Sequence, residues 1–172
     1  MSEYLRVKNY EVLRGTSMAA PFVTAVVAAM KSVEPSLSVN EVKAKLFSTT
    51  KAVPADERKF ARFGLVDMTN AMAAKPTSFV VPQLKENGTV EVDQNLSFTW
   101  ELPIERLVGP GADVKIKILS NSTLTFDQPE QTITKLSTSS VQKLSFSGTV
   151  VDLFVDNVVP VHFEVDGRAY QA

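Results

Sequence analysis

The chain of 172 residues contains no cysteine and a single histidine, His162. The absence of cysteine excludes a disulfide framework, a thiolate metal site and a cysteine nucleophile. The formal net charge is -1 at pH 7, so the strong positive charge of a nucleic-acid-binding protein is missing and we expect no nucleic-acid partner. No apolar run approaches the roughly 20 residues of a transmembrane helix. The first ten residues carry no apolar segment of the kind found in signal peptides.

The composition of the chain divides it into two halves. Residues 1–75 are rich in alanine and methionine and carry net positive charge, whereas residues 76–172 are rich in valine, threonine and serine and carry net negative charge. Pro76 and Pro82 flank a short connection, and proline is typical of such boundaries. We therefore predict two domains, residues 1–75 and residues 76–172.

The first half is predicted to begin with a strand over residues 4–13 and a tight turn at Gly15. Residues 16–33 then form a helix that is apolar around nearly its whole circumference, with Pro21 in the opening turn. Such a helix should be buried in a complete domain. Without its neighbours it should leave an exposed apolar patch.

Two further helices in this half have clear start signals. Ser38 and Glu41 form a capping box ahead of a helix over residues 39–48. Asp67 is suited to cap a short helix over residues 68–74.

The second half alternates apolar and polar residues with the period of a β-strand. The expected strands are 89–92, 96–100, 114–119, 132–136, 141–146, 150–155 and 161–165. Turn signals separate several of them, such as Gly109-Pro110-Gly111 and Asp166-Gly167. Short strands at this spacing predict an antiparallel β-sandwich, so the chain as a whole is expected to be α+β.

The stretch with the strongest chemical signal is Gly15-Thr16-Ser17-Met18-Ala19-Ala20-Pro21. A serine at the first turn of a helix lies where free backbone amides and the helix dipole favour developing negative charge. The same residue type at a helix start is usually only a cap. Physical chemistry alone therefore permits a nucleophile at Ser17 without requiring one.

This stretch resembles the serine signature Gly-Thr-Ser-Met-Ala-x-Pro of the subtilisin-like serine proteases, the subtilases. The long Ala/Val helix, the capped Glu41-Val42-Lys43 helix and Gly64-Leu65-Val66-Asp67 follow the family's carboxyl-terminal segment in order. The resemblance covers residues 4–74. It implies a partial subtilisin-like α/β segment at the start of the chain, followed by the β-sandwich extension.

The resemblance also implies a function, that of a serine endopeptidase acting on protein or peptide substrates. Ser17 would be the nucleophile and its own amide would be one oxyanion-hole donor, with Gly15 and Thr16 supporting the turn. Subtilases present Asp, His and Ser in that chain order. Only 16 residues precede Ser17, so we expect the aspartate and histidine in an upstream part of the catalytic domain. The chain alone is then expected to be inactive.

Other implications of the resemblance concern location and cofactors. Secretion or a cell-surface location is implied, and calcium is possible in the full-length family member. Within this chain we expect no cofactor and no metal site. Pairs such as Asp113 with Asp127 or Asp152 with Asp156 lack a calcium-loop pattern.

The sequence leaves two other interpretations open. Ser17, Asp152 or Asp156, and His162 follow the order of an α/β-hydrolase triad, but Ala19 stands where that motif needs glycine. The β-rich stretch between them also lacks the required βα units. The second alternative is a non-catalytic, truncated protein whose β domain binds a surface or partner. Trp100 is interpreted as a core residue of that domain.

Overall fold

A computed structural model describes residues 15–53, 63–84, 92–93, 95–119, 121–151 and 159–171 of the chain. These residues form α-helices and antiparallel β-sheets, which confirms the α+β class. The chain separates into two compact units, residues 1–36 and residues 37–172. Each unit is described by itself. The strand predicted over residues 4–13 lies outside the described residues, and the predicted boundary at residue 76 stays a prediction.

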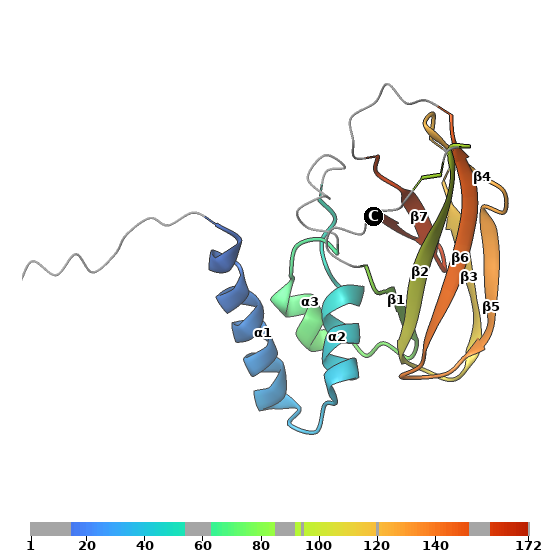
Figure 1. The fold of residues 1–172 in the computed structure, drawn as a ribbon. Helices are drawn as coiled ribbons and strands as arrows, with labels where there is room; N and C mark the ends of the chain where they lie inside the picture. The colour runs from blue at the N-terminus through green and yellow to red at the C-terminus, as the bar shows by residue number, and fades with distance from the viewer. Residues whose placement is uncertain are drawn as a thin grey trace, which may run out of the picture. The chain divides into compact units, whose positions relative to one another are not determined.

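The first unit contains one 3-10 turn, η1 (Thr16–Met18), followed by α1 (Ala20–Val33) (Figure 1). The prediction of one continuous helix from residue 16 was wrong at Ala19, where the 3-10 turn gives way to α1. Proline explains the break, because Pro21 has no N–H to donate to the carbonyl four residues earlier. Instead, the Met18 N–H donates to the Gly15 carbonyl at 3.0 Å.

Burial along α1 is uneven. Val26 and Met30 are buried, with 5% and 1% of their surface exposed, whereas Phe22 is 70% exposed and Val33 64%. The expectation of burial around the whole circumference is therefore confirmed only in part. The exposed apolar side chains agree with the expectation of an apolar patch.

The second unit begins with two capped helices. The helix α2 (Val39–Ser48) has the predicted capping box: Ser38 Oγ accepts from the Glu41 N–H at 3.2 Å, and Glu41 Oε2 accepts from the Ser38 N–H at 2.7 Å. The helix α3 (Met68–Ala73) has Asp67 as its predicted cap, which accepts from the Asn70 N–H at 3.1 Å. This bond and Lys51, whose Nζ lies 3.0 Å from Asp67 Oδ2, lower the pKa of the Asp67 carboxyl.

Within the described ranges, eight strands follow these helices in two four-stranded antiparallel sheets. The first sheet has the order β1-β2-β6-β4 and the second has the order β5-β3-β7-β8. The strands of the first sheet are β1 (Phe79–Pro82), β2 (Ser97–Val108), β6 (Val141–Val150) and β4 (Leu124–Phe126). Those of the second are β5 (Glu130–Leu136), β3 (Ala112–Ile118), β7 (His162–Val165) and β8 (Arg168–Gln171).

Most predicted strands within the described residues are confirmed. Three strands were missed: β1, β4 and β8. The proline-flanked β1 was interpreted as a connection, but it is an edge strand that pairs only with β2. An edge position tolerates Pro82, because proline need not donate to a neighbouring strand there. The predicted strand at 89–92 lies almost wholly outside the described residues, and so does most of the one at 150–155.

Predicted turns are confirmed at two places. Asp166 and Gly167 join β7 to β8 with positive φ angles of 49° and 78°, as a two-residue hairpin turn requires. The segment containing Gly109 joins β2 to β3, and Gly109 has a φ of 101°.

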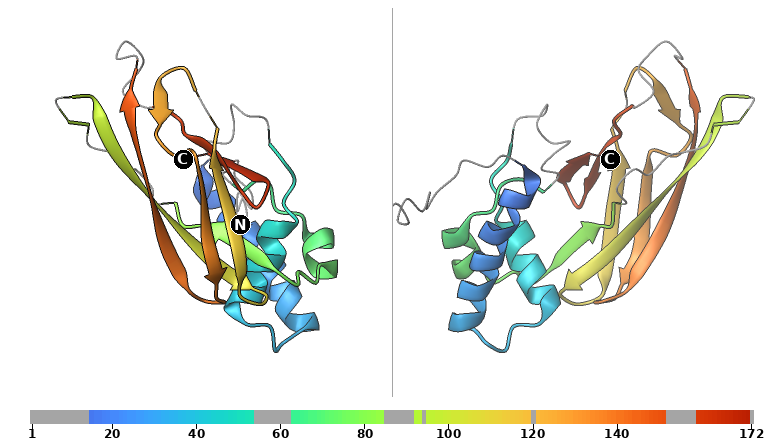
Figure 2. Two further views of the ribbon diagram at one scale, coloured as in Figure 1. Left: turned by 90° about the vertical axis from the view of Figure 1, so that its right-hand side faces the viewer. Right: turned by 60° about the vertical axis from the view of Figure 1, so that its left-hand side comes forward.

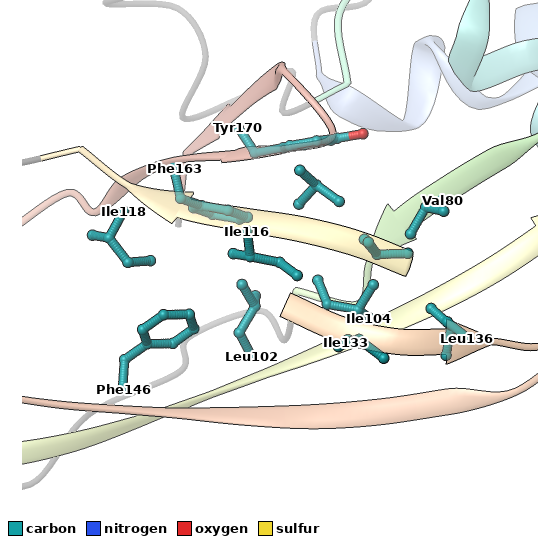
Figure 3. Close-up of a cluster of buried hydrophobic side chains, with 12 residues drawn as sticks. Val80, Leu102, Ile104, Ile116, Ile118, Ile133, Leu136, Phe146, Phe163 and Tyr170 are labelled. Atoms are coloured by element: carbon teal, nitrogen blue, oxygen red, sulfur yellow. The ribbon is translucent and has the colours of Figure 1, made fainter. Parts of the chain in front are cut away.

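The main hydrophobic core draws its side chains from both sheets (Figure 3). Leu102 and Phe146 of the first sheet and Ile116 and Phe163 of the second belong to this one cluster, each with 0–1% of its surface exposed. Trp100 packs against it, with its ring centroid 5.9 Å from that of Phe146 and 5.5 Å from that of Phe163. Trp100 is itself only partly buried, so its interpretation as a core residue is confirmed in part.

One arginine is buried with the apolar side chains of β2. Arg106 has 1% of its surface exposed, and three of its nitrogens donate to neutral oxygens. Nε donates to the Leu136 carbonyl at 2.7 Å, Nη1 to Ser78 Oγ at 2.7 Å and Nη2 to the Ala112 carbonyl at 3.1 Å. The side chain thus joins the start of β1, the start of β3 and the end of β5.

A second apolar cluster joins α2 to the first sheet. Ala44 of α2, Val81 of β1 and Leu107 of β2 are buried together, and Phe47 and Phe63 pack against them. Figures 1 and 2 show α2 beside β1 in each view. The helix α2 is therefore packed onto the strands, and α3 packs against α2.

Candidate active site

Ser17 lies in the middle of η1, directly before α1. Ser17 is exposed, and so are its neighbours Met18 and Ala19. A serine hydroxyl in this place is open to a reactant approaching from outside the unit. The predicted position, at the opening of a helix, is confirmed with the difference that a 3-10 turn carries it.

The backbone around Ser17 depends on Gly15. Gly15 has a φ of +155°, which L side chains rarely adopt, and a Cβ built there would have no atom within 4 Å. Glycine at this position therefore serves backbone conformation and leaves open space beside the turn. Thr16 occupies the first position of η1 and Gly15 directly precedes it, while their predicted role in supporting Ser17 stays a prediction.

Among the described residues, no side chain caps the free amides at the start of α1. Ala19 at the N-cap makes no side-chain hydrogen bond, and the first turn holds no acidic residue. Free N–H groups and the positive end of the helix dipole therefore point toward the segment that contains Ser17. This arrangement favours negative charge near the serine, which is what an acyl-transfer transition state develops.

A base for Ser17 is not found in the part of the chain that the structure describes, where no hydrogen bond joins its hydroxyl to an acidic or imidazole side chain. His162 lies in the second unit, half-buried on β7 and paired with Gln171 of β8. Its strand neighbours Phe163 and Val165 are buried on the opposite face, as the alternation predicted. Asp152 and Asp156, the acids of the alternative hydrolase triad, lie outside the described residues.

The acidic pairs considered for calcium do not gather into a site within the described ranges, where no group of three or more His, Asp or Glu side chains could hold a metal ion. Asp113 accepts from the Lys135 N–H at 2.9 Å and so stabilises the β3–β5 pairing. Asp127 lines a polar hollow beside β2 and β6 together with one other acid, Asp93. Asp93 accepts from the N–H groups of Asn95 and Ser97, each at 2.8 Å. Its carboxylate therefore stabilises the turn that leads into β2.

Two residues that join distant segments were missed in the sequence. Arg106 follows Leu102 and Ile104 at two-residue spacing in β2. The strand period was therefore the signal that could have placed its side chain on the inward face. Arg168 opens β8, and its Nη2 donates to Thr50 Oγ1 at 3.0 Å. No sequence signal connects Arg168 to Thr50, because they lie 118 positions apart.

The comparisons with known proteins bear on the segment that contains Ser17. Residues 2–66 match the model of the subtilase family of peptidases, Peptidase_S8. The matched range includes η1, α1 and α2 and ends directly before Asp67. The chain matches no curated protein. No helix among the described residues is both long and apolar enough to cross a membrane. Residues 2–66 are therefore similar to the subtilase family, which supports a subtilisin-like protease fragment.

Proposed function

We propose that this chain is the carboxyl-terminal part of a subtilisin-like serine endopeptidase, with Ser17 as its nucleophile. The observation that carries the proposal is the position of Ser17: it lies within the subtilase match, in an exposed turn at the uncapped start of α1. Protein or peptide substrates follow from the family. Secretion is part of the proposal because members of this family are expected to act outside the cell.

In the complete enzyme, Ser17 Oγ attacks the carbonyl carbon of a peptide bond while its proton passes to the histidine of the triad. The negative charge that forms on the carbonyl oxygen is held by backbone amides, including that of Ser17. The aspartate and histidine are supplied from outside this sequence. Without that histidine the hydroxyl is a weak nucleophile, so the 172-residue polypeptide alone is inactive.

The β strands form a separate extension in this proposal. Their fold is a β-sandwich, supported by the common core to which both sheets contribute. The chain itself supplies no cofactor. Calcium, if the complete enzyme binds it, is held elsewhere in the catalytic domain.

The nucleotide sequence before the codon for Met1 is the first test. We expect an in-frame continuation that encodes an aspartate and a histidine segment typical of subtilases. The extended polypeptide and the 172-residue chain are then each treated with a fluorophosphonate, which modifies activated serines. We expect labelling at Ser17 in the extended polypeptide and none in the short chain.

Two variants make this test specific. Ser17→Ala must abolish labelling of the extended polypeptide, whereas Ser36→Ala, which changes another exposed serine of the same unit, must leave it unchanged. Stoichiometric labelling of the short chain would disprove its inactivity. A stop codon directly upstream, or a folded extended polypeptide that is not labelled at Ser17, would favour the non-catalytic alternative.

A further inference from the structure

The side chain of Arg168 connects three segments that are far apart in the sequence. Its Nη2 donates to Thr50 Oγ1 at 3.0 Å, and its guanidinium carbon lies 5.3 Å from the centroid of the Phe79 ring. Thr50 follows the end of α2 and Phe79 opens β1. One residue of the last strand therefore holds the end of a subtilase-family helix against an edge strand of the first sheet.

The contact at Thr50 extends into the second part of the family match. Next to it, Lys51 exchanges two backbone hydrogen bonds with Leu65, each 2.9 Å long. Gly64 lies so close to this pair that a Cβ on it would be 2.3 Å from the Lys51 carbonyl oxygen. Lys51 also forms the ion pair with Asp67, the cap of α3. The N-terminal cap of α3 is thus connected to Thr50 through its neighbour Lys51.

Apolar contacts reinforce the same connection. Phe47 of α2 stacks on Phe63 with ring centroids 4.5 Å apart, and Phe63 meets the edge of Tyr170 of β8 at 6.1 Å. Both phenylalanines lie within residues 2–66. They pack against the buried cluster that includes Leu107 of β2. The family segment therefore contacts β1, β2 and β8 through buried side chains.

We infer that the β strands act as a brace for the end of the subtilase segment, and that Arg168 is the main polar link of this brace. The brace is the set of contacts that Arg168, Phe79, Leu107 and Tyr170 make with Ala44, Phe47, Thr50 and Phe63. If the β strands were only a binding module joined to the helices by a linker, removing one of their contacts with the helices would leave the hydrogen bonding of α2 and α3 unchanged. Here, loss of the Arg168 link releases the end of α2, the Lys51–Leu65 pair and α3 together. This inference rests on the family match and is independent of the role of Ser17.

Hydrogen–deuterium exchange on the whole 172-residue chain tests the brace. Arg168→Met keeps an apolar stem but removes the hydrogen bond and the charge over Phe79. Because hydrogen bonds from charged donors are among the stronger ones, we expect amides of residues 45–51 and 65–73 to exchange about tenfold faster through local opening. Amides in the centre of β2 and β6 should change less than about twofold.

Three further variants keep the test decisive. Lys117→Met removes a charge from the same sheet, where Lys117 pairs only across an exposed surface with Glu130 at 3.3 Å, and it should leave α2 unchanged. Thr50→Val removes the acceptor together with the bond that Thr50 Oγ1 donates to the Phe47 carbonyl at 3.3 Å, and should reproduce the effect, whereas Thr50→Ser keeps the hydroxyl and should not. These two variants decide the question if Arg168→Met fails to fold. The brace is disproved if α2 and α3 exchange at wild-type rates in Thr50→Val, or if β2 and β6 loosen as much as α2 does.

Discussion

Replacing Arg106 by methionine tests whether a buried guanidinium without an acidic partner stabilises this fold. The side chain has 1% of its surface exposed and donates three hydrogen bonds of 2.7, 2.7 and 3.1 Å. Methionine has a similar length and fills most of the space, so the substitution removes the bonds and the charge with a small cavity. These three bonds hold together the start of β1, the start of β3 and the end of β5.

The expected magnitude follows from two opposing contributions. Three hydrogen bonds from a charged donor contribute about 1.5–3 kcal/mol each, or roughly 4–9 kcal/mol in all. Transferring the guanidinium out of water costs several kcal/mol, and the substitution removes that cost. The two carbonyls and the hydroxyl of Ser78 then lose their partner in a buried place. We expect a net destabilisation of about 3 kcal/mol, which corresponds to a fall in Tm of about 6–12 °C for a chain of this size.

The assay is urea unfolding followed by tryptophan fluorescence. Trp100 is the only tryptophan, and it packs on Phe146 and Phe163 of the core, so its emission reports directly on the β core. Lys143→Met is the matched control, because the Lys143–Glu101 pair is exposed on both sides and should change stability by less than about 1 kcal/mol. Arg106→Met as stable as the wild type would refute the reasoning. It would show that the cost of desolvating the charge cancels the three bonds.

Two further predictions concern backbone space and a buried hydroxyl. Gly64→Ala should destabilise the chain by about 3 kcal/mol in urea unfolding, because it combines a φ of +96° with a 2.3 Å approach to the Lys51 carbonyl. Gly167→Ala, at a φ of +78° with nothing within 4 Å, should cost only about 1 kcal/mol, and equal effects would contradict the argument from close approach. Burial raises the pKa of Tyr170 from 10.0 to about 12, so the folded state holds this proton more tightly than the unfolded state. The stabilisation is therefore complete below pH 10 and lost as the pH rises toward 12. Tyr170→Phe should flatten this alkaline decline in the urea midpoint. At pH 7 it should be neutral or stabilising by up to about 1 kcal/mol, since the hydroxyl has no hydrogen-bond partner among the described residues. A large loss of stability at pH 7 would show that the hydroxyl is in fact bonded.

Local signals in the sequence predicted the features that depend on neighbouring residues. The capping box at Ser38, the bounds of α2 and the Asp67 cap are confirmed, because each depends on atoms within three or four positions along the chain. The alternation in the second half predicted most of the described strands and the inward face of β7. The short strands β4 and β8 carried too few residues for their period to be recognised.

The candidate site was predicted from the sequence as far as a motif can reach. Gly15 to Pro21 indicated both the family and the serine, and the structure adds that Ser17 is exposed in a 3-10 turn. The proposed role of Ser17 depends on acid and base groups that the described part of the chain does not bring to it.

The sequence by itself determined the family segment, the helix caps, the turns and the strand period, because those features are encoded in adjacent residues and in short repeats. Only the tertiary structure decided which strands pair and that both sheets share one core. It also decided that Arg168 meets Thr50 and that Arg106 joins three strand ends. The physical reason is that hydrogen bonding and burial between segments far apart in the sequence, up to the 118 positions between Thr50 and Arg168, depend on how the whole chain packs, and no local pattern specifies that packing.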